Sequence, residues 1–144
     1  MCIIDTNVVV AGLLTSDPSS PTAQLLDAML DGRLAYLLSS DLLHEYRTVL
    51  LRPRLRSAHG LGPEQIDDLL TEIVANAIWR DPAALAGSEA APDPGDQHLW
   101  ALLAHEPAAL LVSGDRLLQQ KPKTGSSVVS PATALLGLGL AGDA

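Results

Sequence analysis

Short apolar runs alternate along the chain with longer stretches in which apolar residues recur every three or four positions. The first pattern is typical of buried strands and the second of helices that bury one face. The predicted strands are residues 2–4, 34–38, 78–79, 110–112 and 128–129. Because strand and helix signals alternate, the chain is expected to fold as βα units around a parallel sheet, which is the α/β class.

Proline, glycine and capping residues mark the ends of the predicted helices. Ser20 and Pro21 begin one helix, Gly32 closes it, and Pro53 stops the next. The predicted helices cover residues 21–31, 41–51, a stretch that begins at 63, 97–105 and a stretch that begins at 131. Segment 81–95 is rich in Pro, Ala and Gly and is predicted to be a loop. We expect one domain over residues 1–140.

Composition narrows the class of protein. Of the 144 residues, 47% are hydrophobic and 18% are charged, which indicates a globular chain. The single cysteine, Cys2, excludes an internal disulfide and suits a reducing cytoplasm. No run approaches the ~18 apolar residues that cross a bilayer, and Asp5 interrupts the first apolar run too early for a secretion signal. We therefore expect a cytoplasmic protein with no membrane partner.

The charge of the chain is acidic, but its cations are clustered. A net charge of −8 argues against binding nucleic acid by general electrostatic attraction. Seven of the nine cations nevertheless fall in two short windows, which contain Arg47, Arg52, Arg54 and Arg56, and Arg116, Lys121 and Lys123. Solvated surface charge and contact with phosphates are both open interpretations of these groups.

Four acidic residues fall at comparable positions of the predicted fold. Asp5 and Asp115 each follow a predicted strand, and Asp96 directly precedes a predicted helix. In a parallel sheet with right-handed crossovers these points meet at one edge. Glu45 lies at the border of the apolar stripe of its helix, from which a carboxylate can reach the same edge. We expect the four carboxylates to lie close together.

A cluster of carboxylates predicts a divalent cation. The acids would repel one another and raise one another's pKa values, and a bound cation removes this penalty. Oxygen ligands suit Mg²⁺ or Mn²⁺, which can activate water and hold a phosphodiester for hydrolysis. Taken singly, each acid has an ordinary alternative role as a helix cap, a turn residue or a surface side chain. Those roles do not explain why all four fall on one edge.

Other chemistries find less support in the sequence. The four histidines lack zinc-site spacing, and no Gly-rich phosphate loop is present. His98, two residues after Asp96, could approach a phosphate or could simply be packed.

Four segments together resemble the PIN-domain nucleases, and in particular the toxin components of bacterial toxin–antitoxin modules, the VapC-like proteins. They are DTNV at 5–8, LLHEY at 42–46, PDPGD at 92–96 and LVSGDR at 111–116. The resemblance extends from residue 1 to about residue 138. It implies a three-layer α/β/α sandwich with a central parallel sheet. It also implies an endoribonuclease that depends on Mg²⁺ or Mn²⁺, forms homodimers and is inhibited by a small antitoxin protein.

By position, Asp5, Glu45, Asp96 and Asp115 match the acidic quartet of that family, which is both catalytic and metal-binding. Asn7 and Ser113 match polar positions that support the ligands or a bound water, and Asp93 matches an auxiliary acid. Two departures stand out, because Leu117 and Gly95 occupy positions where the family often has a further acid. Fewer acids there could weaken a second metal site.

The expected reaction is hydrolysis of an RNA phosphodiester. Asp5, Asp96 and Asp115 would coordinate the metal, and Glu45 would orient or deprotonate the attacking water. The residues expected to contact RNA phosphates are Arg47, Arg52, Arg116 and Lys121.

Two rival functions come from other classes. Phosphatases of the haloacid dehalogenase type need a second Asp where this chain has Asn7. A degenerate PIN domain that only binds RNA or protein is the non-enzymatic alternative.

Overall fold

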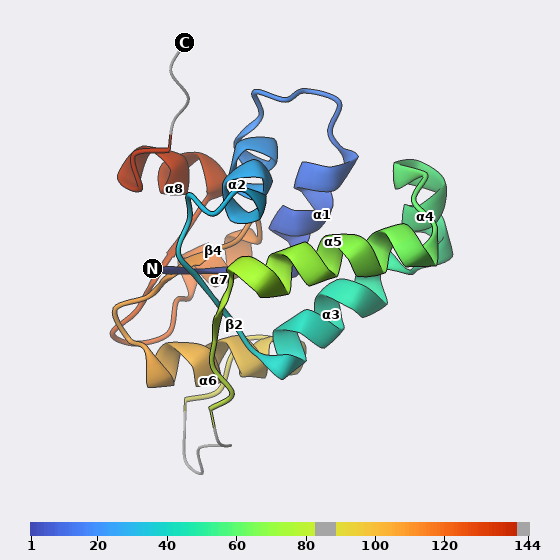
Figure 1. The fold of residues 1–144 in the computed structure, drawn as a ribbon. Coiled ribbons are helices and arrows are strands. Elements are labelled where there is room, and N and C mark those ends of the chain that lie inside the picture. Colours follow the sequence, from blue (N-terminus) through green and yellow to red (C-terminus); the bar gives the residue numbers. More distant parts are fainter. Residues whose placement is uncertain (83–88, 141–144) are drawn as a thin grey trace.

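All five strands of the central sheet run parallel, in the order β3-β2-β1-β4-β5. The computed structural model describes residues 1–82 and 89–140 (Figure 1). The strands are β1 (Cys2–Ile4), β2 (Tyr36–Leu38), β3 (Ile78–Trp79), β4 (Leu110–Val112) and β5 (Ser127–Val129). Each overlaps a strand predicted from the apolar runs, so the parallel α/β sheet is confirmed.

Helices cover both faces of this sheet. They are α1 (Thr6–Leu14), α2 (Pro21–Leu30), α3 (Ser40–Leu50), α4 (Pro53–His59), α5 (Pro63–Asn76), α6 (Gln97–His105), α7 (Arg116–Gln120) and α8 (Pro131–Gly137), with a 3₁₀ turn, η1 (Pro94–Asp96), before α6. The chain winds from β1 outward to β3 and then returns through β4 to β5, so right-handed crossovers place the connecting helices of the two halves on opposite faces, while the terminal helix α8 packs against α2. Figure 1 shows α1 and α2 on one side of the strands and α6 on the other. This is the expected three-layer sandwich.

Three helices did not emerge from the sequence pattern. Helix α1 contains the run Val8-Val9-Val10, whose β-branched side chains favour strands, and it forms because Val8 and Val9 are buried against the core. Pro53 does follow the end of α3, but it is also the first residue of α4, where a missing backbone N–H costs nothing. Helix α7 has only five residues, too few to show a periodic pattern.

Strands β1 and β2 lie in the buried hydrophobic core. Every side chain of β1 and β2 is fully buried, including the Cys2 thiol. Tyr46 on α3 is also fully buried, and its hydroxyl donates a hydrogen bond to the carbonyl of Ile4. This bond joins α3 to the end of β1 and thereby places Glu45, the preceding residue, beside that end. Within the described part of the chain, no helix has the length and apolarity that a bilayer crossing requires.

Helices α1 and α2 approach each other most closely at Gly12. A Cβ atom there would lie 2.6 Å from the carbonyl oxygen of Thr22, which belongs to the backbone and cannot rotate away. We expect Gly12→Ala to lower the free energy of unfolding by about 1–3 kcal/mol, because the two helices must separate. Urea denaturation measures this change.

Gly137→Ala is the matched control, since a Cβ at that exposed position in α8 meets no atom within 4 Å. It should be neutral or stabilising by up to about 1 kcal/mol, as alanine favours helices. Equal effects of the two substitutions would contradict the close approach of α1 and α2.

Candidate active site

The candidate site lies where the direction of winding reverses. Strands β1 and β4 are neighbours, but the chain leaves them toward opposite edges of the sheet. Such a switch point opens a crevice at the carboxyl ends of the strands, where α/β proteins bind ligands. Asp5 follows β1 directly, and its backbone N–H donates to the carbonyl of Val112 at 2.9 Å. Asp115 follows β4 after two intervening residues, so both acids stand at this crevice.

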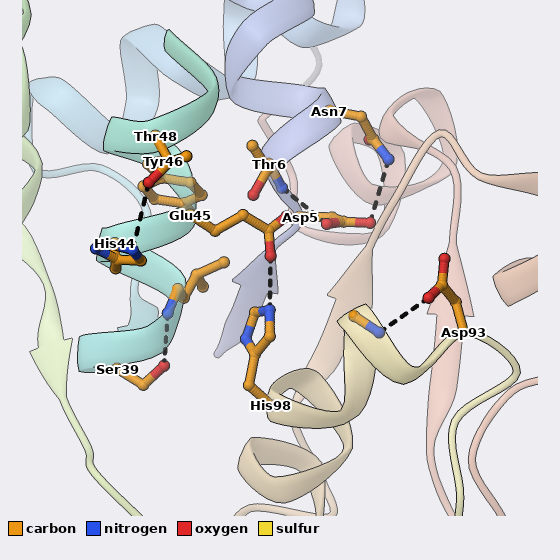
Figure 2. Close-up of polar contacts among 12 residues, drawn as sticks. Asp5, Thr6, Asn7, Ser39, His44, Glu45, Tyr46, Thr48, Asp93 and His98 are labelled. Carbon is orange, nitrogen blue, oxygen red and sulfur yellow. Dashed lines mark hydrogen bonds and ion pairs between the residues drawn. The ribbon is translucent and has the colours of Figure 1, made fainter. Parts of the chain in front are cut away.

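Asp5 is a buried carboxylate held by three donors, of which Figure 2 shows Thr6 and Asn7. It is only 4% exposed. Its Oδ1 accepts a hydrogen bond from the Thr6 backbone N–H at 2.8 Å, and its Oδ2 accepts from Ser113 Oγ at 2.7 Å and Asn7 Nδ2 at 3.1 Å. Burial raises the pKa of Asp5; the bonds from Ser113 and Thr6 lower it in part, and the charge of Glu45 adds to the rise. The carboxylate is therefore fixed in position, but its ionised form is destabilised by burial and by the charge of Glu45.

Ser113 and Asn7 connect the loop after β4 to the start of α1. Ser113 Oγ also accepts from the Asp115 backbone N–H at 3.0 Å, and Asn7 Oδ1 accepts from the Gly114 backbone N–H at 3.0 Å. Both residues thus contact Asp5 and orient the neighbouring loop. The auxiliary role assigned to them from the sequence stays a prediction, and this geometry is compatible with it.

All four acids of the predicted quartet line one pocket of about 520 Å³, which we call the acidic pocket. Its lining residues are Asp5, Thr6, Asn7, Val10, Ala11, Leu14, Glu45, Val49, Arg52, Asp93, Asp96 and Asp115. The auxiliary acid Asp93 is therefore part of the same pocket. The four acids therefore lie at one edge of the sheet, as the topology rules predicted.

Several of these acids also cap local structure. Asp5 caps α1, Asp115 Oδ1 accepts from the Leu117 backbone N–H at 2.8 Å at the start of α7, and Asp93 Oδ1 accepts from the Gly95 backbone N–H at 2.9 Å. The capping interpretation was therefore right for Asp5. Asp115, whose alternative role was that of a turn residue, is also a helix cap, and both acids still line the pocket. Asp96 differs, because it stands at the cap position of α6 without a capping bond from its side chain.

Negative charge in the acidic pocket is poorly compensated. Burial, together with the negative charges of Asp5, Asp93 and Glu45, raises the pKa of Asp96 to about 6. Among the described residues that line the pocket, Arg52 is the one cation. A set of carboxylate oxygens with excess negative charge suits a hard divalent cation.

The carboxylates do not form a ready-made metal site. In residues 1–82 and 89–140, no group of three or more His, Cys, Asp or Glu side chains is arranged so that it could hold a metal ion. One reason is that Asp5, Asp93 and Asp115 each direct an oxygen at a hydrogen-bond donor of the protein. Metal coordination by the quartet stays a prediction. Carboxylate oxygens are suitable ligands for a divalent cation, but the side chains would have to move closer together to share one.

Glu45 pairs with His98, a residue that the sequence analysis left undecided. Glu45 Oε2 and His98 Nε2 are 2.7 Å apart, and the two side chains are 30% and 14% exposed (Figure 2). Burial opposes a charge on His98, but the hydrogen bond to Glu45 and nearby acids outweigh it and raise its pKa. The same bond lowers the pKa of Glu45. The sequence placed His98 near the site because it lies only two residues after Asp96 at the start of α6.

The other predicted phosphate contacts lie away from the acidic pocket. Arg47 is exposed and pairs with Asp67 at 3.0 Å, while Arg116 and Lys121 are exposed near α7 and do not line the acidic pocket. Their contact with RNA stays a prediction. Leu117, where the family often has an acid, is 42% exposed and so leaves that side of the site without a carboxylate.

A family model described as PIN domain matches residues 1–117, which contain all four acids of the acidic pocket and the strands β1 to β4. The chain belongs to the PIN-domain family. PIN domains are generally nucleases and typically use divalent metal ions, so a hydrolase that acts on nucleic acid is the activity this membership supports. Comparisons with curated proteins and with solved structures found no match.

The repulsion within this PIN-domain pocket predicts a gain of stability when one charge is removed. In the folded protein Asp96 ionises at about pH 6, above its unfolded value, so ionisation between about pH 4 and pH 6 favours unfolding. Asp96→Asn should therefore stabilise the metal-free protein by about 1 kcal/mol above this range, after allowance for solvent screening, and have little effect below it.

Thermal unfolding in a chelator across this pH range tests the expectation. Asp68→Asn, which removes the same formal charge from an exposed site on α5, is the matched control and should show no such pH dependence. A lower stability of the Asp96 variant at neutral pH would contradict the uncompensated charge.

Proposed function

We propose that this PIN domain is a metal-dependent endoribonuclease and the toxin of a toxin–antitoxin pair. The observation that carries the proposal is the meeting of Asp5, Glu45, Asp96 and Asp115 in one pocket at the switch point of the sheet. The proposed partners are an RNA substrate, a small antitoxin protein and a second copy of the chain. The match to the PIN-domain family supports nuclease activity, and the toxin role is the finer part of the proposal.

Asp5, Asp96 and Asp115 would hold Mg²⁺ or Mn²⁺. When bound, such an ion neutralises the charge that develops on the phosphate and makes a bound water more acidic. Asp5 is prepared for this role by its fixed orientation, and Asp96 by a carboxylate that no capping bond engages. The raised pKa values of both acids mean that cation binding would relieve a penalty already present in the fold.

Glu45 would orient the attacking water and accept its proton. The His98 bond lowers the Glu45 pKa, which keeps the carboxylate ionised and able to accept a proton near neutral pH. Oε2 of Glu45 is engaged by His98, so the attacking water would be held by the other oxygen. His98 acts here as a positioning residue. Arg52, which lines the acidic pocket, would hold a substrate phosphate beside the acids.

An RNA cleavage assay with purified protein in Mg²⁺ or Mn²⁺ tests the nuclease assignment. Asp5→Asn and Asp96→Asn should each reduce cleavage by about 100-fold or more, because each removes a metal ligand. Calorimetric titration with Mn²⁺ alone should show weaker binding to both variants than to wild type. Metal-dependent cleavage that survives both substitutions would sink the assignment of the quartet.

One observation favours a second candidate, an RNA-binding module without catalysis. The described acids do not already converge on an ion, and Leu117 and Gly95 stand where further acids are common. A folded, antitoxin-free protein that binds RNA with the same affinity in chelator and in Mg²⁺, and cleaves none, would establish this alternative.

The Glu45–His98 pair predicts a graded effect of substitutions at His98. His98→Ala should lower kcat by about 10- to 100-fold, the usual effect of losing a residue that orients a catalytic group. His98→Gln, which can still donate a hydrogen bond to Glu45, should recover part of this loss. His105→Ala, an exposed position at the end of the same helix α6, should leave kcat unchanged. Equal activity of the Ala and Gln variants would refute a positioning role.

A further inference from the structure

The acidic pocket continues into a second pocket on each side. On one side it shares Glu45, Val49 and Arg52 with a pocket of about 380 Å³, which we call the His44 pocket. On the other side it shares Asn7, Ala11 and Asp115 with a pocket of about 480 Å³, which we call the Thr22 pocket. The two outer pockets have no lining residue in common. The acids therefore lie in the middle of a trough that extends in both directions.

The two ends of the trough differ in chemistry. The His44 pocket is lined by Asp41, His44, Glu45, Thr48, Val49, Arg52, Pro94, Gly95 and His98. It therefore contains an arginine and two imidazoles together with the carboxylates of Asp41 and Glu45. The Thr22 pocket is lined by Asn7, Val8, Ala11, Thr22, Gly114, Asp115 and Pro131. Its one charged residue is an acid, which disfavours a phosphate. Figure 2 shows the same asymmetry around Asp5, with His98 and Glu45 on one side and Asn7 on the other.

The lining of the Thr22 pocket suits a flat apolar group with polar edges. Ala11 and Pro131 supply apolar surface, and Thr22 adds a hydroxyl group to the wall. Small-molecule sites commonly combine such walls with a few polar groups that fix orientation. A nucleobase has this chemistry, and in an RNA strand it is covalently attached next to a phosphate.

We infer that the Thr22 pocket is a subsite for one unpaired nucleobase next to the scissile phosphate, while Arg52 holds a phosphate on the other side of the acids. This inference rests on the proposed nuclease function. The occupant is inferred from the continuity of the two pockets, because Asn7 and Asp115 line both the Thr22 pocket and the acidic pocket. A ligand in the Thr22 pocket is thus adjacent to a phosphate at the acids.

Two properties of the substrate follow. A base can enter a side pocket only when it is unpaired, so the substrate is single-stranded RNA or an unpaired loop. A trough that continues on both sides of the acids also accepts a strand that extends in both directions, which favours cleavage within a chain over removal of terminal nucleotides.

The test uses a short fluorescent single-stranded RNA of mixed sequence whose cleavage position has been mapped with the wild-type protein. Replacing one flanking nucleotide by an abasic residue should lower kcat/KM by about 10-fold on one side of the scissile phosphate only. Thr22→Phe, which fills the pocket, should lower kcat/KM for the intact RNA but not for that abasic RNA. Thr48→Phe in the His44 pocket is the matched control and should keep the one-sided dependence.

Equal loss from abasic residues on the two sides, or an effect of Thr22→Phe that persists on both abasic RNAs, overturns the subsite. RNA binding, measured by fluorescence anisotropy with Ca²⁺ in place of Mg²⁺, distinguishes failure of the subsite from failure of the nuclease proposal. Cleavage that needs Asp5 but ignores the abasic residue defeats the subsite alone. Single-strand binding that Thr22→Phe weakens, without any cleavage in Mg²⁺, supports the subsite and defeats the nuclease proposal. If that binding is indifferent to Thr22→Phe and equal for duplex RNA, the subsite also fails.

Discussion

The buried carboxylate of Asp5 is the constraint on which the site depends. A charge removed from water destabilises the fold by several kcal/mol unless donors compensate it. Here the compensation comes from Thr6 and Asn7 at the start of α1 and from Ser113 after β4. The loop after β4 must therefore lie against the end of β1, and this fixes the crevice at the switch point. The same contact holds Asp115 at the pocket, since its backbone N–H donates to Ser113.

Capping and the proposed catalytic role are compatible at this site because a carboxylate has two oxygens. Asp115 and Asp93 each use Oδ1 to satisfy a backbone N–H at the start of a helical turn, which sets the direction of the other oxygen. Glu45 is restrained in the same way by His98. Asp96 alone has no such restraint from a helix cap, and its pKa is raised to about 6. The acid that caps no helix is thus one whose pKa is raised by burial and by the neighbouring negative charges.

The sequence was sufficient for the sheet and for the shared edge of the acids. Strands such as β4 are short apolar runs, and the handedness of crossovers then determines where Asp5 and Asp115 must lie. It was not sufficient for α1, where burial of Val8 and Val9 overrides the strand preference of β-branched residues. Nor could it give the Glu45–His98 pair, which joins side chains 53 positions apart. The same limit applies to metal coordination, which depends on side-chain positions within a pocket.

The proposed RNA substrate would have to be recognised by something other than general charge, because both the pocket and the protein are acidic. The net charge of −8 and the carboxylates around Arg52 repel a phosphate backbone at long range. A bound cation would remove this repulsion at the acids but not along the rest of the strand. Attraction must then come from short-range contacts, and apolar contact with a base is insensitive to the sign of the surrounding charge. The trough therefore combines an end that carries Arg52 and two histidines with an apolar end, and the acids of the acidic pocket lie between them.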